Sequence, residues 1–193
     1  MQMSLYLIQG ASQQQVTFEL PMGYTTRFEG VFKVTPALTP EHKEYLEAFA
    51  GSRRMKRDVA ATEKLPDRRR LAVGLRVGDE GGYYVGSADD GNFGQGDGNR
   101  PDKTVLSVNR PPQGQPALFC QWAPTKDGSG IEWDGVEKFH RYVEWLEYLI
   151  DHFLAPWGYK INGDVNWQGE TKEDFGSIYA RNNSVTTSGV PGA

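Results

Sequence analysis

The alternation of apolar and polar side chains predicts a strand near the start of the chain. Residues 27–34 place Phe28, Phe32 and Val34 on one face, with Gly30 between them. Successive side chains of a strand point to opposite faces, so this spacing is typical of a half-buried strand.

Helical spacing predicts two helices, a short one and a long one. Residues 40–50 follow Thr39, a good N-cap, and begin with a proline, which suits the first helical position. The long helix is expected to begin at the N-cap Asp134 and to end before Pro156. Its apolar positions form one wide stripe: Phe139, Tyr142, Val143, Leu146, Leu149, Ile150 and Phe153.

A second apolar stripe lies beside the main one on the long helix. Trp145 and Tyr148 form it, with His152 one turn further on. The wide apolar face predicts more burial than usual, so this stripe either packs under the N-terminal segment or meets a partner. The opposite face is polar and carries His140, Glu144, Glu147 and Asp151.

Short apolar runs between turn-rich segments predict the remaining strands. The expected pairs are residues 71–75 with 83–86, 118–122 with 130–133, and 178–181 with 184–186, while residues 159–170 form a strand that contains a turn. The near-continuous apolar run 118–122 favours a central strand. The whole pattern predicts an α+β fold: a mostly antiparallel, twisted sheet of about six strands, with one long and one shorter helix packed on it.

The length of 193 residues fits one domain. We expect a single α+β domain at residues 27–186 and a flexible C-terminal tail at residues 187–193. Apolar pieces at residues 5–8 and 16–20 make residues 1–26 an N-terminal extension or hairpin.

Composition narrows the classes of protein. Cys120 is the single cysteine, so no internal disulfide forms, and the N-terminus lacks the basic start and long apolar run of a signal peptide. No apolar stretch reaches the ~18 residues that a membrane span requires. We therefore expect a soluble, cytoplasmic protein without a membrane contact; its oligomeric state stays open.

Charge is distributed unevenly along the chain. Residues 53–76 contain nine Lys/Arg and three Asp/Glu, a net charge of +6 in a chain whose total is −4, so the remainder carries −10. An acidic remainder would repel a polyanion, so any contact with nucleic acid would be local.

Seven cations of this window form two dense clusters. They are Arg53, Arg54, Lys56 and Arg57, then Arg68, Arg69 and Arg70. The clusters could be a solvated helix end, a site for phosphate or nucleic acid, or a surface for an acidic protein patch. We predict that they form the main recognition surface, because unpaired cations that repel one another gain from an anionic partner. Pairing with carboxylates of the two helices is the alternative, and the Trp145/Tyr148 stripe is the second candidate surface.

No catalytic, metal or cofactor site is predicted. A catalytic thiolate needs an electropositive, partly exposed setting, whereas Cys120 lies in an apolar run and is expected to be buried and inert. His140 and Glu144 lie one helical turn apart without the second histidine of a zinc helix. The loop at residues 87–103 lacks the spacing of a calcium loop and the ending of a P-loop, so it is interpreted as a mobile surface loop.

Four segments resemble a family of small proteins from bacterial, plasmid and phage genomes. They are residues 53–58 (RRMKRD), 119–122 (FCQW), 137–150 (EKFHRYVEWLEYLI) and 162–170 (NGDVNWQGE). The resemblance covers residues 27–186 and brings no established activity, cofactor or catalytic residue. It implies an accessory protein of a mobile element that acts by binding a host component.

The sequence therefore predicts a non-catalytic interaction protein whose partner is another protein. One alternative is an enzyme or sensor for a phosphorylated small molecule or nucleotide, with the arginines as phosphate ligands and Glu132 and Asp134 for acid/base chemistry. Another is local nucleic-acid binding by the same arginines, with exposed Trp side chains for stacking.

Overall fold

The computed structural model describes residues 25–87, 101–136 and 138–189. The strands are β1 (Arg27–Gly30), β2 (Phe32–Thr35), β3 (Lys56–Arg57), β4 (Val105–Ser107), β5 (Trp122–Pro124), β6 (Gly130–Trp133), β7 (Lys160–Gln168), β8 (Phe175–Arg181) and β9 (Ser184–Ser188). The helices are α1 (Pro40–Ala50), α2 (Val59–Thr62), α3 (Arg68–Ala72) and α4 (Tyr142–Leu149), with a 3-10 turn η1 (Asp79–Gly81) and a π-helical turn η2 (Ile150–Leu154).

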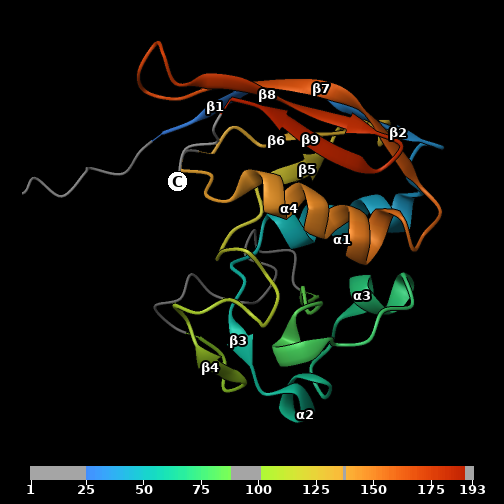
Figure 1. Cartoon of the computed structure of the whole chain (residues 1–193). Helices are drawn as coiled ribbons and strands as arrows, with labels where there is room; N and C mark the ends of the chain where they lie inside the picture. The colour runs from blue at the N-terminus through green and yellow to red at the C-terminus, as the bar shows by residue number, and fades with distance from the viewer. Residues whose placement is uncertain (1–24, 88–100, 137, 190–193) are drawn as a thin grey trace, which may run out of the picture.

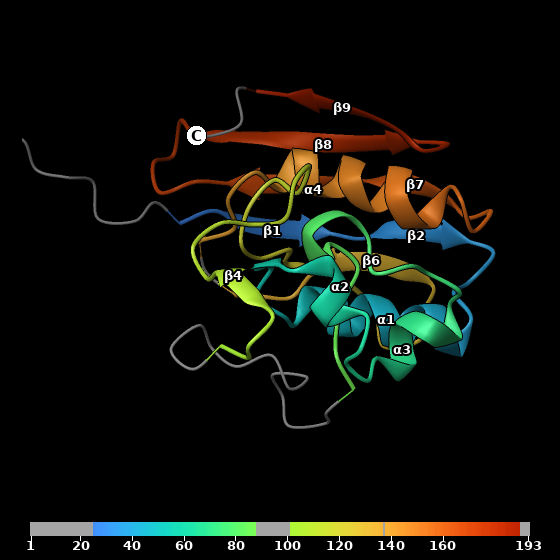
Figure 2. The same cartoon turned by 90° about the horizontal axis from the view of Figure 1, so that it is seen from below.

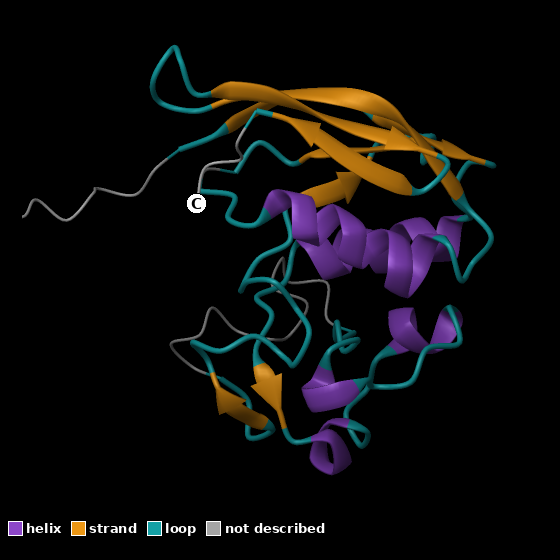
Figure 3. Cartoon of the chain, in the orientation of Figure 1, coloured by secondary structure: helices purple, strands orange, loops and turns teal. Residues whose placement is uncertain are grey.

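An antiparallel sheet forms the first of three layers (Figures 1 and 3). Its order is β5-β6-β2-β7-β8-β9, and β1 also pairs with β7. The helices α1 and α4 lie beneath one face as the middle layer. Residues 52–87 and 101–116, which include β3, β4, α2 and α3, lie beneath the helices and are called here the third layer; Figure 2 shows it in front of the helices. This is the predicted α+β fold.

Aromatic and aliphatic side chains fill the space between the sheet and the helices. From the sheet come Phe32, Trp122, Ile131, Ile161, Val165 and Ile178, and from the helical side come Phe139, Tyr142, Leu146, Leu149, Ile150 and Phe153. All of these side chains are buried. The main apolar stripe predicted for the long helix therefore faces the core, with Val143 only half-buried at its margin.

Two local predictions are confirmed. Thr39 caps α1, because its hydroxyl oxygen accepts a hydrogen bond from the His42 amide at 3.3 Å. Asn182 and Asn183 form the turn of the closing hairpin with φ angles of 50° and 74°, as the favoured two-residue turn requires. The strand β9 continues to Ser188, so the predicted tail begins too early.

The strand predicted at residues 27–34 is divided into β1 and β2. Gly30 has a φ of 124°, and a Cβ atom there would lie 2.6 Å from the carbonyl oxygen of Asp164. Glycine is required here, because β7 passes directly beside the chain and leaves no room for a side chain. β7 itself is continuous, so the turn predicted within residues 159–170 is wrong.

The prediction of a central strand at residues 118–122 is also wrong. β5 begins only at Trp122 and lies at an edge of the sheet. Earlier in the run, the Leu118 carbonyl accepts a hydrogen bond from the Arg54 amide at 2.8 Å, so this part of the run contacts the third layer. The predicted pairing with residues 130–133 is confirmed, with Trp122 opposite Trp133.

The hairpin predicted from residues 71–75 and 83–86 does not form. Residues of the first run belong to α3 or to the turn after it. In the second run the Val85 amide donates to the Asp67 carboxylate at 3.1 Å, so a side chain takes the place of a neighbouring strand.

The long helix begins later than predicted. Asp134 accepts a hydrogen bond from the Val136 amide at 2.9 Å and so closes a turn instead of capping a helix. Arg141 adopts a left-handed conformation, φ 56°, immediately before α4. The predicted N-terminal extension and the loop at residues 87–103 lie almost entirely outside the described residues.

Candidate functional site

Polar and charged side chains make up much of the interior of the third layer. The buried ones are Ser52, Arg54, Arg57, Thr62, Asp67, Arg69, Arg70, Thr104 and Gln115. Buried polar groups are costly unless they are hydrogen-bonded. Four of the seven cations proposed as a recognition surface are therefore part of the interior.

Arg54 is the most deeply buried of these cations, with 1% of its surface exposed. Its guanidinium donates to neutral oxygens: Ser52 Oγ at 2.8 Å, the carbonyls of Gly82 and Tyr84 at 2.9 and 3.0 Å, and Gln115 Oε1 at 3.3 Å. It also lies over the Phe49 ring, 4.2 Å from the centroid. Burial lowers the pKa of Arg54. Within the described residues no carboxylate pairs with it.

Arg57 connects β3 to the segment before β4. Its Nη1 donates to Asp102 Oδ2 at 2.6 Å and to Thr104 Oγ1 at 2.7 Å, and its guanidinium covers the Tyr84 ring at 4.6 Å. Partial burial raises the pKa of Asp102, but hydrogen bonds from Thr104 and Arg57 lower it by more. The pKa therefore lies below its usual value. The pair is thus an internal cross-link of the third layer.

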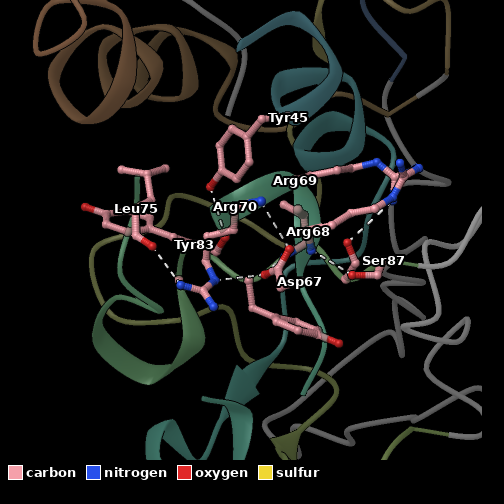
Figure 4. Close-up of polar contacts among 12 residues, drawn as sticks. Tyr45, Asp67, Arg68, Arg69, Arg70, Leu75, Tyr83 and Ser87 are labelled. Atoms are coloured by element: carbon pink, nitrogen blue, oxygen red, sulfur yellow. Dashed lines mark hydrogen bonds and ion pairs between the residues drawn. The ribbon is translucent and has the colours of Figure 1, made fainter. Parts of the chain in front are cut away.

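Asp67 organises the second cluster (Figure 4). Its carboxylate accepts hydrogen bonds from the amide and the Nε of Arg70, at 3.3 and 3.0 Å, as well as from Val85. Arg70 also donates to the Leu75 carbonyl at 2.7 Å. Burial raises the pKa of Asp67, and the hydrogen bonds from Val85 and Arg70 oppose that shift.

Arg68 and Arg69 join the third layer to α1. Both lie against Glu44 Oε1, at 3.2 and 3.1 Å. Pairing with carboxylates of the two helices is the alternative for the cationic clusters, and Glu44 of α1 is such a carboxylate. Other cations of the clusters pair with Glu80, Asp102 and Asp67, which belong to the third layer.

The structure thus corrects the prediction that these cations form an exposed surface. Arg57, Arg69 and Arg70 are only 2%, 6% and 6% exposed. The more accessible members also have partners: Arg53 donates to the Val108 carbonyl at 2.8 Å, and Lys56 pairs with Glu80. The physical reason is that buried loop carbonyls need donors, and a guanidinium supplies five in a fixed geometry.

Trp145 and Tyr148 are also interior side chains, 0% and 7% exposed. Their rings pack against Phe49 of α1, with centroid distances of 6.0 and 6.2 Å. The Tyr148 hydroxyl reaches the third layer, where it accepts a hydrogen bond from Gln115 Nε2 at 3.1 Å. The second stripe of the long helix therefore packs within the fold, and Trp145 is out of reach of a partner.

An open hollow of about 420 Å³ lies between α4 with η2 and the third layer. We call it the acidic hollow, and it is lined by Gly114, Gln115, Pro116, Arg141, Glu144, Glu147, Tyr148, Asp151 and His152. The polar stripe of the long helix was visible in the sequence. The contribution of residues 114–116 was missed, because no local pattern places that loop beside the helix.

Like charges crowd together at the acidic hollow. Burial raises the pKa of Glu147, and repulsion by Glu144 and Asp151 raises it further. Glu144 pairs with Arg141 at 3.0 Å, whereas Glu147 and Asp151 have no cationic partner among the described residues. His152 shares a hydrogen bond with the Tyr83 hydroxyl at 2.8 Å and stacks on Tyr148 at 4.0 Å, and burial lowers its pKa.

Cys120 is fully buried, as predicted, and burial raises its thiol pKa to about 12. In the part of the chain that the structure describes, no three His, Cys, Asp or Glu side chains gather as metal ligands. None of the helices in that part is long and apolar enough to cross a membrane.

Comparison with known proteins adds no relative: no family model, curated protein or solved structure matches this chain. The resemblance to small proteins of bacterial, plasmid and phage genomes therefore stays a prediction.

Proposed function

We propose that this protein is a non-catalytic binding protein and that the acidic hollow is its recognition surface for a protein partner. The observation that carries the proposal is the acidic hollow itself, an open concavity walled by two layers of the fold. Concave surfaces with a few convergent polar groups are where proteins most often bind ligands.

Charge selects a basic partner. Glu144, Glu147 and Asp151 outnumber the single Arg141 in the lining. The field at the acidic hollow is set by these nearby carboxylates, so it attracts cations. Complementary charge speeds encounter and excludes acidic partners.

Phosphate, nucleotide or nucleic-acid binding by the arginine clusters has less support. Arg54, Arg57, Arg69 and Arg70 are buried, and each already holds carbonyl, amide or carboxylate oxygens. A polyanion would have to displace contacts that hold the third layer together. The cytoplasmic location and the mobile-element origin belong to the same proposal and rest on the sequence.

Affinity capture from the native host, followed by mass spectrometry, tests the proposal. The bait is the full chain, compared with a triple variant that carries Glu144→Gln, Glu147→Gln and Asp151→Asn. We expect a stoichiometric basic protein with the wild type and its loss with the variant. The purified pair should also dissociate as salt is raised, since charge drives the contact.

A second triple variant controls for net charge. Glu29→Gln, Glu41→Gln and Glu63→Gln remove the same charge from exposed positions outside the acidic hollow. This variant should retain the partner. Equal capture by all three baits would contradict the proposal, and copurification of a nucleotide instead of a protein would favour the phosphate alternative.

A further inference from the structure

The lining of the acidic hollow includes a hydroxyl group whose proton has no acceptor among the described residues. Tyr148 is 7% exposed, and its hydroxyl oxygen accepts a hydrogen bond from Gln115 Nε2 at 3.1 Å. Both residues line the hollow. Within the described residues no acceptor takes the proton of this hydroxyl. Because Tyr148 lines an open hollow, an acceptor that enters from solution can take this proton.

The neighbouring amide cannot supply that acceptor. Gln115 Oε1 accepts from Arg54 Nε at 3.3 Å, while its Nε2 donates to the Gly82 carbonyl at 2.6 Å as well as to Tyr148. The buried guanidinium thus holds the amide with its NH₂ group toward the tyrosine. The Tyr148 hydroxyl is left as a donor for a molecule that enters the acidic hollow.

Carboxylates also line the acidic hollow. Glu147 and Asp151 lie one helical turn apart and have no cationic partner among the described residues. Their mutual repulsion with Glu144 would be relieved by a bound cation. A ligand that satisfies both features carries a positive charge and also a hydrogen-bond acceptor.

We infer that the acidic hollow binds a lysine- or arginine-bearing peptide segment, whose cationic side chain meets Glu147 and Asp151 while one of its carbonyl oxygens accepts the Tyr148 proton. The inference rests on the proposed function and names the chemistry of its partner. A polyamine supplies the cations but no acceptor, so it should not use Tyr148. The two ligands can therefore be distinguished.

Calorimetric titration with a capped hexalysine peptide and with spermine tests the inference. Glu147→Gln should weaken both ligands by about two- to fivefold, as for an exposed ion pair. Tyr148→Phe should weaken hexalysine by about three- to tenfold, the effect of one hydrogen bond, and leave spermine unchanged. The ring packing of Tyr148 on His152 and Phe49 is kept in this variant, and circular dichroism checks that it folds.

Tyr179→Phe is the matched control, because Tyr179 lies on β8 and does not line the acidic hollow. If Tyr148→Phe behaves like this control while Glu147→Gln still weakens hexalysine, the acidic surface stands and the inference about Tyr148 is overturned. Equal weakening of spermine by Tyr148→Phe would also overturn it, since the tyrosine would then only support the wall. If wild-type protein binds no hexalysine, both the inference and the proposed basic partner are contradicted.

Discussion

The two sides of the middle layer are stabilised in different ways. Toward the sheet, α1 and α4 bury Phe32, Trp122, Leu146 and similar side chains in an apolar core. Toward the third layer, the same helices meet guanidinium groups, amides and backbone carbonyls. One helix layer thus separates an apolar interior from a polar one.

The difference follows from how each region satisfies its backbone. In the sheet, strand pairing uses the N–H and C=O groups, so side chains are free to be apolar. The third layer has only short helices and one two-stranded pair. Its carbonyls at Leu75, Gly82 and Tyr84 instead accept hydrogen bonds from Arg70 or Arg54. A dense cationic run can therefore be the internal scaffold of an irregular segment.

The largest expected effect belongs to the apolar core. Phe153 is fully buried between Tyr45, Phe49 and Trp157. Phe153→Ala should lower the free energy of unfolding by about 3 to 5 kcal/mol, because it removes a large side chain and leaves a cavity. Urea unfolding measures this change. Phe175→Ala is the matched control at an exposed position of β8, and a similar loss at both sites would show that burial is not the cause.

Replacement of Arg54 tests the polar side. Arg54→Ala should cost about 2 to 4 kcal/mol, since it leaves buried acceptors at Ser52, Tyr84 and Gln115 without the donor that they share. Arg54→Lys should recover only part of this loss, because an ammonium lacks the fork geometry. Arg68→Ala, at an exposed position, should cost about 0 to 1 kcal/mol.

Equal melting temperatures for the Arg54 and Arg68 variants would mean that the buried arginine does not stabilise the third layer. The same measurement separates a structural arginine from one that is kept for recognition. If an arginine served only recognition, its variant would lose binding of the partner but keep the melting temperature of the wild type.

A smaller and pH-dependent effect is expected at Asp102, whose pKa is lowered in the folded protein. Such a carboxylate stabilises the fold above its unfolded pKa, and that contribution is lost as the pH falls through the folded pKa. Asp102→Asn should therefore cost about 1 to 3 kcal/mol at pH 7, and the difference from wild type should shrink below about pH 4. Urea unfolding between pH 7 and 3 measures it. The exposed Asp79→Asn serves as control, and a pH-independent difference at Asp102 would argue against the ion pair.

The smallest effect concerns reactivity and leaves stability unchanged. Cys120 is buried and its thiol pKa is raised to about 12, so a thiol reagent should not modify the native protein. Ser184→Cys supplies an exposed thiol on β9 as a positive control. The variant should show one reactive thiol when native and two when unfolded. Rapid labelling of Cys120 in the native wild type would contradict its burial.

The sequence by itself determined the elements whose signals are local. The Thr39 cap and the proline after it were sufficient to place α1, and the Asn182-Asn183 pair was sufficient to place the closing hairpin. Helical spacing identified the inward stripe of α4, and apolar neighbours correctly predicted that Cys120 is buried. In these cases the residues that carry the signal lie within a few positions of one another in the sequence.

Only the tertiary structure decided whether the charged clusters are exposed to solvent or buried. Arg54 finds acceptors about 30 and 60 residues away in the sequence, at Tyr84 and Gln115, and Val85 uses the Asp67 side chain in place of a strand. The acidic hollow likewise needs residues 114–116 beside α4. A run of arginines has the same sequence whether it faces water or buried carbonyls, because the difference is set by which distant acceptors the fold brings within hydrogen-bond reach.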